Sequence, residues 1–420
     1  MLIHAEIWTL KDLFVLPNEN IYWALQIVLY PFMTGLVAGA FVLSSLYHVF
    51  GIKKLKDIAR FALVFSFSLL FVAPIPLLMH LLHPERALNV FMTPHFTSAI
   101  ASFGVIFFTY ASLVAVELWL LYRKRFVTES LRYREMKHKR LFQALTGLIY
   151  TILTLGAYDI SEEALHRDEK SSKVAAGIGI PVALFLHGYV GFIFGSVKAN
   201  ALWMTPLMPV IFIASAVVSG IALCILVYVL TTMARGALER RKAARNASHV
   251  AAHKLKADPV VVKMTASYLL AFLILAVSLE LLDLLFRSYT AQKSWDALRS
   301  VIFKHDFMSE FVLQYGLGEL LPLLLLVIPG ITIRRATIAS LFVVFGVLMM
   351  RYNVVIGGQA FSLTFSGFME YKMPIIPTSI ETYKEGLFGG LTVFAVPFLF
   401  FTIVNKFLPA YSDAIEPQAD

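Results

Sequence analysis

Long apolar runs separated by short polar segments recur along the whole chain. Nine of these runs are long enough to cross a bilayer as helices; they lie near 21–50, 59–82, 97–122, 174–195, 206–233, 264–286, 307–331, 336–357 and 386–408. A tenth apolar stretch, 141–158, contains one amide, Gln143, and has the composition of an ordinary span. The pattern predicts an all-α membrane protein, a polytopic helical bundle with nine or ten transmembrane helices.

The composition agrees with this fold class. Hydrophobic residues make up 59% of the 420 residues and charged residues 15%, whereas about a quarter of a typical soluble chain is charged. The first residues, MLIHAEIWTLKDLF, contain no basic segment and no small-residue cleavage site, so we expect no removable signal peptide. We expect residues 1–420 to form a single integral membrane domain, with no soluble domain beyond the loops.

The placement of Lys and Arg bears on the number of crossings. If 141–158 crosses the membrane, the cations divide almost evenly between the two sides. If it does not, they concentrate on one side, in the segments 53–60, 123–140, 234–263 and 334–335. The positive-inside rule favours this nine-span topology, with the N-terminus outside, the C-terminus in the cytoplasm, and 141–158 re-entrant or lying on the surface. We expect the membrane to be a bacterial inner membrane. The apolar character of 141–158 keeps the ten-span alternative open.

Several classes of chemistry find no support in the sequence. The net charge of +9 belongs to the inner loops and does not indicate a nucleic-acid partner. Cys224 is the only cysteine, and one thiol can neither form an internal disulfide nor hold an iron–sulfur cluster. A bis-histidine haem requires two histidines at matching depth, and only His187 lies clearly inside a span. The sequence has no phosphate-binding loop, dinucleotide fingerprint, zinc-type Cys/His cluster or serine elbow. We therefore expect no haem, iron–sulfur cluster or metal in this chain.

Residues that suit a quinone headgroup gather in the half of the bundle that the topology places outside. A quinone needs an apolar slot open to lipid, hydrogen-bond partners for its two carbonyl oxygens and a proton donor or acceptor, because its reduction takes up protons with the electrons. Histidine and tyrosine provide such groups. The candidates are Gln26, Tyr30, His80, His83, Arg86, His95, His187 and Tyr189. Aromatic residues near span ends are also common interfacial anchors, which is the interpretation we prefer for Trp23 and Trp203.

An arginine inside a span is the second unusual feature. Arg351 lies in FGVLMMRYNVVIGGQ (345–359), and a charge at the centre of a membrane helix costs about 2.5–3.5 kcal/mol on insertion scales. We therefore expect the guanidinium to face the bundle interior and to pair with an acidic side chain. The polar candidates for this cluster are Glu117, Glu280, Asp283, Glu310, Glu319 and the nearby Asn353. Such a cluster is either a structural ion pair or part of a proton pathway from the inner side, and the residues leave both alternatives open.

Five segments, taken in order, resemble one family of membrane proteins. They are YPFMTGLVAGAFVLSSLYHVFG (30–51), HPERALNVFMTPHFTSAIASFG (83–104), IPVALFLHGYVGFIFG (180–195), LWMTPLMPVIFIASAVVSGIAL (202–223) and MRYNVVIGGQ (350–359). Their content and order resemble the NrfD/PsrC family, the integral quinone-interacting subunits of polysulfide-reductase-like complexes, and especially its longer branch associated with hydrogenases and sulfite reductases. The resemblance covers about 30–408. It implies two four-helix bundles, here approximately 21–195 and 206–357, and a flanking C-terminal helix at 386–408.

The resemblance also implies a function and site residues. Family members exchange electrons between a membrane quinone or menaquinone and an iron–sulfur (ferredoxin-like) or multihaem cytochrome partner, here on the outer face, and some are proposed to translocate protons. The family's quinone site would fall on Asn18, Gln26, Tyr30, His187 and Tyr189. Its histidine on the first helix has no counterpart in NENIYWALQIVLYPF. Asp283, Glu319 and Arg351 fall where family members carry acid, acid and arginine.

The expected function is therefore a quinone-binding membrane subunit of a respiratory oxidoreductase complex, to which the enzyme activity belongs as a whole. The alternative is a proton channel or a secondary transporter without a redox role.

Overall fold

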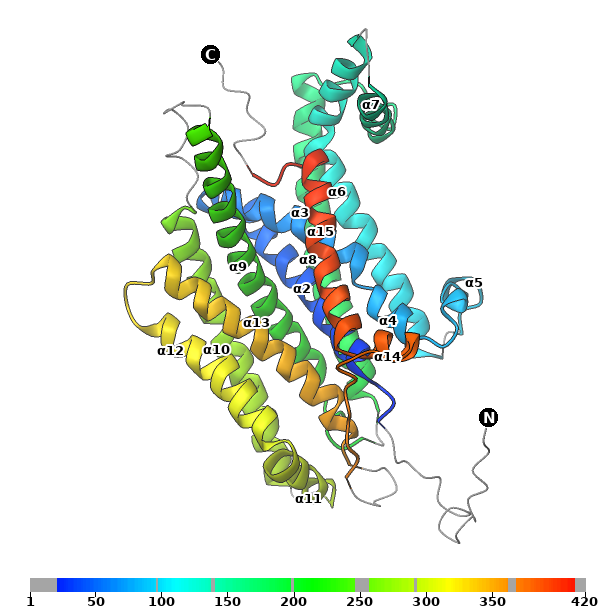
Figure 1. Ribbon diagram of the computed structural model, residues 1–420, viewed down its shortest axis with the longest axis vertical. Helices are drawn as coiled ribbons and strands as arrows, with labels where there is room; N and C mark the ends of the chain where they lie inside the picture. The colour runs from blue at the N-terminus through cyan, green and yellow to red at the C-terminus, as the bar shows by residue number, and fades with distance from the viewer. Residues whose placement is uncertain are drawn as a thin grey trace.

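The computed structural model describes residues 21–95, 97–136, 140–197, 200–245, 257–290, 293–361 and 368–411, which form a bundle of long helices (Figure 1). The long helices are α2 (Leu25–His48), α3 (Lys56–Val72), α6 (Ala99–Glu135), α8 (Glu162–Gly195), α9 (Met208–Arg245), α10 (Pro259–Thr290), α13 (Ile333–Val355) and α15 (Leu387–Phe407). The π-helix η4 (Met308–Leu320) runs directly into α12 (Leu321–Val327), and together they form one span. The shorter helices are η1 (Lys53–Leu55), α4 (Ile75–His80), η2 (Pro84–Arg86), α5 (Asn89–Met92), α7 (Leu141–Leu153), α11 (Lys293–Ser300), η3 (Val301–His305), η5 (Gly357–Gln359) and α14 (Ile380–Glu385).

Nine helical segments in the described residues are long and apolar enough to cross a membrane, and each coincides with one of the nine predicted spans. The all-α membrane fold class is therefore confirmed. The tenth apolar stretch forms α7, which has only 13 residues and is too short for a crossing. It lies beside the C-terminal end of α6 (Figure 1), where the Trp119 indole donates a hydrogen bond to the Leu153 carbonyl (2.8 Å).

The two ends of the bundle are named here from the charge pattern. The end at which α2 begins is the predicted outer end, and the opposite end is the predicted inner end. The start of α2 and the end of α15 lie at these opposite ends (Figure 1), which is the arrangement that an odd number of crossings requires.

Three helices continue well past their predicted spans, all of them at the predicted inner end. Helices α6 and α9 run on to Glu135 and Arg245, while α8 begins at Glu162. The extra turns are rich in Arg, Lys, Glu and Ala, which are good helix formers. Apolar patterning marks only the part of a helix that lies in lipid, so it predicted the spans but not the full helices.

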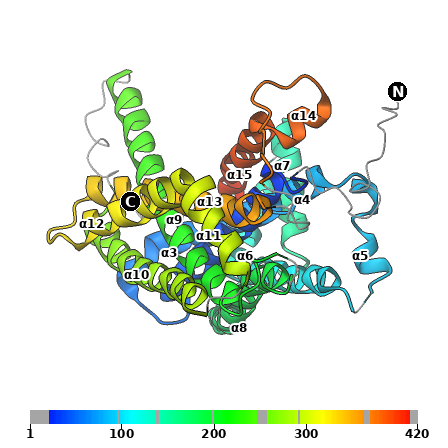
Figure 2. The same cartoon turned by 90° about the horizontal axis from the view of Figure 1, so that it is seen from below.

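Helix packing joins the two predicted helix groups through α9. In the first group α2 packs on α3 and α8, and α6 packs on α8; in the second, α9, α10, η4, α12 and α13 pack on one another. Helix α2 also packs along α9, where Gly39 and Gly220 meet so closely that a Cβ on Gly39 would lie 2.8 Å from the Gly220 Cα. The buried apolar side chains form one continuous core. Viewed from below, α10 and α12 lie at one side of the bundle and α5 at the other (Figure 2).

A tight turn joins α12 to α13 at the predicted inner end. Gly330 has a φ of +75°, a left-handed conformation that glycine adopts without steric cost. The Arg335 guanidinium donates hydrogen bonds to the carbonyls of Leu325, Ile328 and Gly330. It thereby satisfies carbonyl groups that the end of α12 leaves without helical partners.

Trp23 and Trp203 pack on each other at the predicted outer end, and the burial of Trp203 shows that its interpretation as an interfacial anchor was wrong. Their rings stack with centroids 5.0 Å apart, and Trp203 is 5% exposed. The cause is the segment that carries Trp203, which folds over the end of α13, where the indole donates to the Val354 carbonyl. The Gln359 side chain completes this contact by accepting from the Trp23 N–H (3.1 Å) and donating to the Trp23 carbonyl (3.1 Å).

Gly220→Ala is expected to destabilise the bundle, because the new Cβ would overlap the Gly39 backbone and push α2 away from α9. Overpacking of this kind costs about 1–3 kcal/mol. Gly177→Ala in α8 is the control, since no atom lies within 4 Å of a Cβ built there. Reaction of the buried Cys224 thiol with a thiol-reactive dye during heating measures both variants. Equal melting temperatures would contradict the close contact.

Candidate functional site

Arg351 is fully buried and is held by uncharged partners. Its Nη2 atom donates to Ser215 Oγ (2.6 Å) and to His187 Nε2 (3.0 Å). The guanidinium carbon lies 3.7 Å from the centroid of the Phe212 ring, which is a cation–π contact. Because arginine can only donate, His187 must accept at Nε2 and carry its proton on Nδ1. The structure thus joins a residue predicted for quinone binding to one predicted for proton transfer.

The expectation that Arg351 pairs directly with an acidic side chain was wrong. Among the described residues, the arginines that form ion pairs with carboxylates are others, such as Arg287 and Arg123. The reason is the rotation of the helix: residues 351 and 353 point about 200° apart around α13. Arg351 therefore faces α8 and α9, whereas Asn353 faces η4.

A polar cluster on this second face of α13 collects Asn353, Gln314, Glu280 and Glu319. Gln314 accepts a hydrogen bond from Asn353 Nδ2 at its Oε1 (2.8 Å). Its Nε2 donates to Glu280 Oε2 (2.8 Å) and, over a longer distance, to Glu319 Oε1 (3.4 Å). One amide thus brings together three residues predicted for the proton pathway, from α10, η4 and α13.

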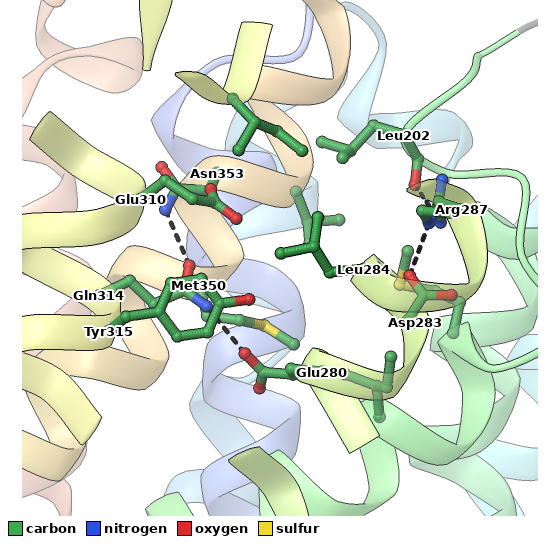
Figure 3. A pocket seen from close by; sticks show the side chains of 14 residues that line it. Leu202, Glu280, Asp283, Leu284, Arg287, Glu310, Gln314, Tyr315, Met350 and Asn353 are labelled. Carbon is green, nitrogen blue, oxygen red and sulfur yellow. Dashed lines mark hydrogen bonds and ion pairs between the residues drawn. The ribbon is translucent and has the colours of Figure 1, made fainter. Parts of the chain in front are cut away.

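A cavity of about 70 Å³ opens beside this cluster (Figure 3). Its polar wall includes Glu280, Asp283, Glu310, Gln314 and Asn353. It has room for several water molecules, because a water needs about 10–15 Å³ on this measure. The side-chain oxygen of Asn353, Oδ1, has no hydrogen-bond partner in the described part of the chain.

A much smaller cavity, about 10 Å³, lies between the cluster and the arginine. Its lining includes Ser215, Glu280 and Glu319. Ser215, which accepts a hydrogen bond from Arg351, therefore lines the same cavity as the two acids.

Asp283 lies across the larger cavity and has its own cation (Figure 3). Its carboxylate accepts from Arg287 Nε (2.7 Å) and from Thr205 Oγ1 (2.6 Å). Arg287 also donates to the carbonyls of Ala201 and Leu202. Asp283 therefore combines a structural ion pair, which ties α10 to the 201–205 segment, with a place in the cavity wall.

Glu117 lies apart from the other acids, on α6. It is 1% exposed, and its Oε1 is 3.6 Å from His48 Nδ1, which in turn is 3.0 Å from Ser44 Oγ. These three residues form a separate polar site towards the predicted inner end. Within the described ranges, no group of three or more His, Cys, Asp or Glu side chains is arranged to hold a metal ion.

A second candidate site lies at the predicted outer end, where α2 begins. A pocket of about 570 Å³ is lined by Ile21, Tyr22, Ala24, Glu370, Tyr371, Lys372, Pro374 and Glu385. The Tyr371 hydroxyl accepts from the Leu25 N–H (3.1 Å) and donates to the Glu385 carbonyl at the long distance of 3.5 Å. Burial, together with the neighbouring Tyr352 and Glu385, raises the pKa of Tyr371 to about 12. The phenol therefore keeps its proton at neutral pH.

Two of the residues predicted for quinone binding lie next to this pocket. His80 Nδ1 is 3.0 Å from Glu385 Oε1, and Gln26 Nε2 donates to the Lys384 carbonyl (2.5 Å). Both contacts are to α14, the short helix that supplies Glu385 to the pocket wall. The described structure thus links the first predicted span to α14 at this end.

The other predicted quinone-binding residues do not line the pocket. Tyr30 packs edge-on against Phe103 of α6, and the Tyr189 hydroxyl donates to the Ala99 carbonyl (3.0 Å). His83, Arg86 and His95 are exposed on the 81–98 segment, which projects from the bundle around α5 (Figure 1); His83 pairs there with Glu85 and His95 with Thr97. Asn18 lies outside the described residues.

Sequence reasoning missed several residues of both sites. Gln314, the centre of the acidic cluster, had an available signal, because it is an amide inside the apolar run FVLQYGLGEL (311–320). Ser215 resembles many other hydroxyl residues in membrane helices and had none. Tyr371 and Glu385 belong to a connecting segment that meets α2 only in the folded chain, and no pattern singled them out.

The fold and the polar groups within it define a polytopic membrane protein. The family model described as "Polysulphide reductase, NrfD" matches residues 16–363, so the chain belongs to the NrfD family. A selenate reductase subunit from Mesobacillus selenatarsenatis is 29% identical over 344 residues, which are 80% of this chain and 73% of that protein. The putative dimethyl sulfoxide reductase membrane subunit from Halobacterium salinarum is 27% identical over 386 residues, 89% of this chain and 75% of that protein.

Replacement of His187 by Ala is expected to destabilise the protein, because it removes an acceptor from a buried guanidinium. Leaving such a group with fewer partners costs about 1–3 kcal/mol. His187→Gln should recover part of this loss, because the amide oxygen can accept the same hydrogen bond. Cys224 reactivity during heating measures the stability of both variants. Wild-type melting of His187→Ala would show that the histidine does not hold Arg351.

Proposed function

We propose that this chain is the quinone-binding membrane subunit of a reductase complex and that it exchanges electrons with a partner protein at the predicted outer end. The observation that carries the proposal is the pocket around Tyr371 and Glu385, which opens beside the start of α2 in a chain of the NrfD family. The two relatives, named as subunits of a selenate reductase and of a dimethyl sulfoxide reductase, support a role within a complex.

The chemistry of this pocket suits a quinone headgroup. Its volume, about 570 Å³, lies within the range of about 300–1,000 Å³ of small-molecule sites. Tyr371 is a neutral donor, and its long hydrogen bond to the Glu385 carbonyl leaves the hydroxyl free to turn towards a quinone oxygen. The Glu385 carboxylate and His80, 3.0 Å apart, provide a pair of groups that can hold or pass a proton near the headgroup.

The quinone supplies the redox chemistry when it is bound, and this chain supplies binding, orientation and proton exchange. An iron–sulfur or cytochrome subunit docked at the predicted outer end would take or give the electrons there. Lys and Arg concentrate in the loops at the opposite end of the bundle, which supports placing this end outside a bacterial inner membrane.

We further propose that the cluster of Glu280, Gln314, Glu319 and Asn353 carries protons. Glu280 and Glu319 share hydrogen bonds from one neutral amide, and a proton held between two neighbouring acids relieves their mutual repulsion. The cavity of about 70 Å³ connects this cluster to Glu310 and Asp283, in the direction of the predicted outer end.

Tyr371→Phe should weaken quinone binding, because it removes the donor from the outer pocket. One hydrogen bond is worth about 0.5–1.5 kcal/mol, so KM for the quinol should rise by up to about tenfold with little change in kcat. Tyr383→Phe is the matched control, since its hydroxyl bonds Thr392 away from the pocket lining. Both are measured as quinol-dependent turnover of the reconstituted complex. If the unmodified complex shows no quinone-dependent turnover at all, the proposal fails and a proton channel or transporter is favoured.

Glu280→Gln and Glu319→Gln should each lower turnover-linked proton movement in vesicles by at least about tenfold, because the amide cannot carry the proton. The folded state should persist, since the amide keeps the shape of the side chain. Glu381→Gln on α14, which is exposed, is the control. Proton movement unchanged in both cluster variants would contradict the relay and leave the cluster a structural role.

A further inference from the structure

A groove on the lipid-facing side of α10 and η4 lies directly outside the acidic cluster. Its volume is about 310 Å³. Most of its lining is apolar, including Leu281, Leu284, Phe311 and Leu320, and the polar residues in the wall are Tyr315 and Glu319. Leu281 is 46% and Leu320 56% exposed, so the groove opens away from the protein interior and towards the hydrocarbon of the membrane.

Tyr315 and Glu319 connect this groove to the polar interior. Tyr315 lines both the groove and the cavity of about 70 Å³, and Glu319 lines both the groove and the cavity of about 10 Å³ beside Ser215. Glu319 is 7% exposed, and its Oε2 atom has no hydrogen-bond partner in the described chain. Glu319 therefore belongs both to the acidic cluster and to the wall of the groove, and its buried Oε2 atom has no hydrogen bond that a ligand would have to replace.

The local backbone is also unusual. Phe311, Tyr315 and Glu319 all belong to the π-helix η4 (Met308–Leu320). Such helices are rare and occur frequently at functional sites. This geometry sets the wall of the groove apart from the regular helices that face lipid elsewhere in the bundle.

Depth in the membrane limits which ligand can enter. Glu319 lies a little past the middle of the 20-residue span Met308–Val327. Phospholipid headgroups stay at the interface, about 15 Å from the centre of a hydrocarbon layer that is about 30 Å thick. The ligand must therefore be apolar overall and carry a hydrogen-bonding head into the hydrocarbon, which is the chemistry of a quinone or hydroquinone.

We propose that this groove is a second quinone site, separate from the pocket at the predicted outer end, in which an oxygen of the headgroup hydrogen-bonds Tyr315 or Glu319. The inference rests on the proposed function, because it takes this chain to work with the quinone pool. The site changes no oxidation state: a hydroquinone hydroxyl gives its proton to the Glu319 carboxylate, the hydroquinone anion takes a proton back from the same acid, and electrons are exchanged only at the outer pocket. The buried acids thereby gain direct contact with the quinone pool.

The test uses the assembled complex in lipid nanodiscs that contain a quinone with a photoreactive azide on its ring. Peptides labelled on illumination are identified by mass spectrometry. Labelling should saturate on 308–323 and be prevented by unmodified quinone, and it should also occur on 21–26 and 370–385, which line the outer pocket. Labelling of 308–323 that does not saturate, or that palmitate prevents as well as quinone does, overturns the inference.

A pair of tryptophan variants distinguishes the groove from general exposure to lipid. Leu281→Trp fills the groove, whereas Leu282→Trp changes a neighbouring side chain that is 56% exposed but does not line it. Labelling of 308–323 should fall about tenfold in Leu281→Trp alone, which corresponds to about 1.4 kcal/mol, while labelling of 370–385 stays constant in both. Equal labelling of 308–323 in the two variants overturns the inference. Labelling of 308–323 without any labelling of the outer pocket supports this site and contradicts the proposed function instead.

Discussion

The organising constraint of this bundle is a permanent positive charge that has no access to water. Hydrocarbon offers no hydrogen-bond partners, so the Arg351 guanidinium must find its partners inside the protein. His187 of α8 and both Ser215 and Phe212 of α9 supply these contacts. The imidazole of His187 in turn leaves no space beside α2, since a Cβ on Gly35 would lie 3.1 Å from it. One side chain thus fixes the relative positions of α2, α8, α9 and α13, which come from both predicted helix groups.

The choice of uncharged partners for Arg351 has consequences for the acids nearby. Asp283 is held in a direct ion pair by Arg287. Glu280 and Glu319 are bonded instead to the neutral amide of Gln314. Ser215, which accepts a hydrogen bond from Arg351, lines a cavity of about 10 Å³ together with these two acids. The contacts that hold Arg351 therefore do not include either of these two acids.

The sequence was sufficient for the number and positions of the spans, because burial in lipid requires continuous apolar runs, and the asymmetry of basic residues correctly set 141–158 apart. It could not supply the partner of Arg351, because this depends on how α8, α9 and α10 are rotated relative to α13. The partners of Gln314 could not be predicted for the same reason, although its amide stands out inside an apolar run. The outer pocket could not be predicted because the segments that form it are far apart in the sequence: Leu25 and Tyr371, which share a hydrogen bond, are 346 positions apart. The depth of a side chain in the membrane can be predicted from the sequence pattern, whereas its contact partners depend on how the helices are rotated relative to one another.

The reciprocal hydrogen bonds between the Gln359 side chain and the Trp23 backbone join two segments that are 336 positions apart in the sequence. Trp23 lies between Tyr22 and Ala24, which line the outer pocket, and Gln359 follows the helix that carries Arg351 and Asn353. The chain that enters α2 and the end of α13 are therefore held as one unit by the Gln359 amide and by Trp203, which stacks on Trp23 and donates to the Val354 carbonyl. The wall of the outer pocket is thus continuous with the helix that carries Arg351.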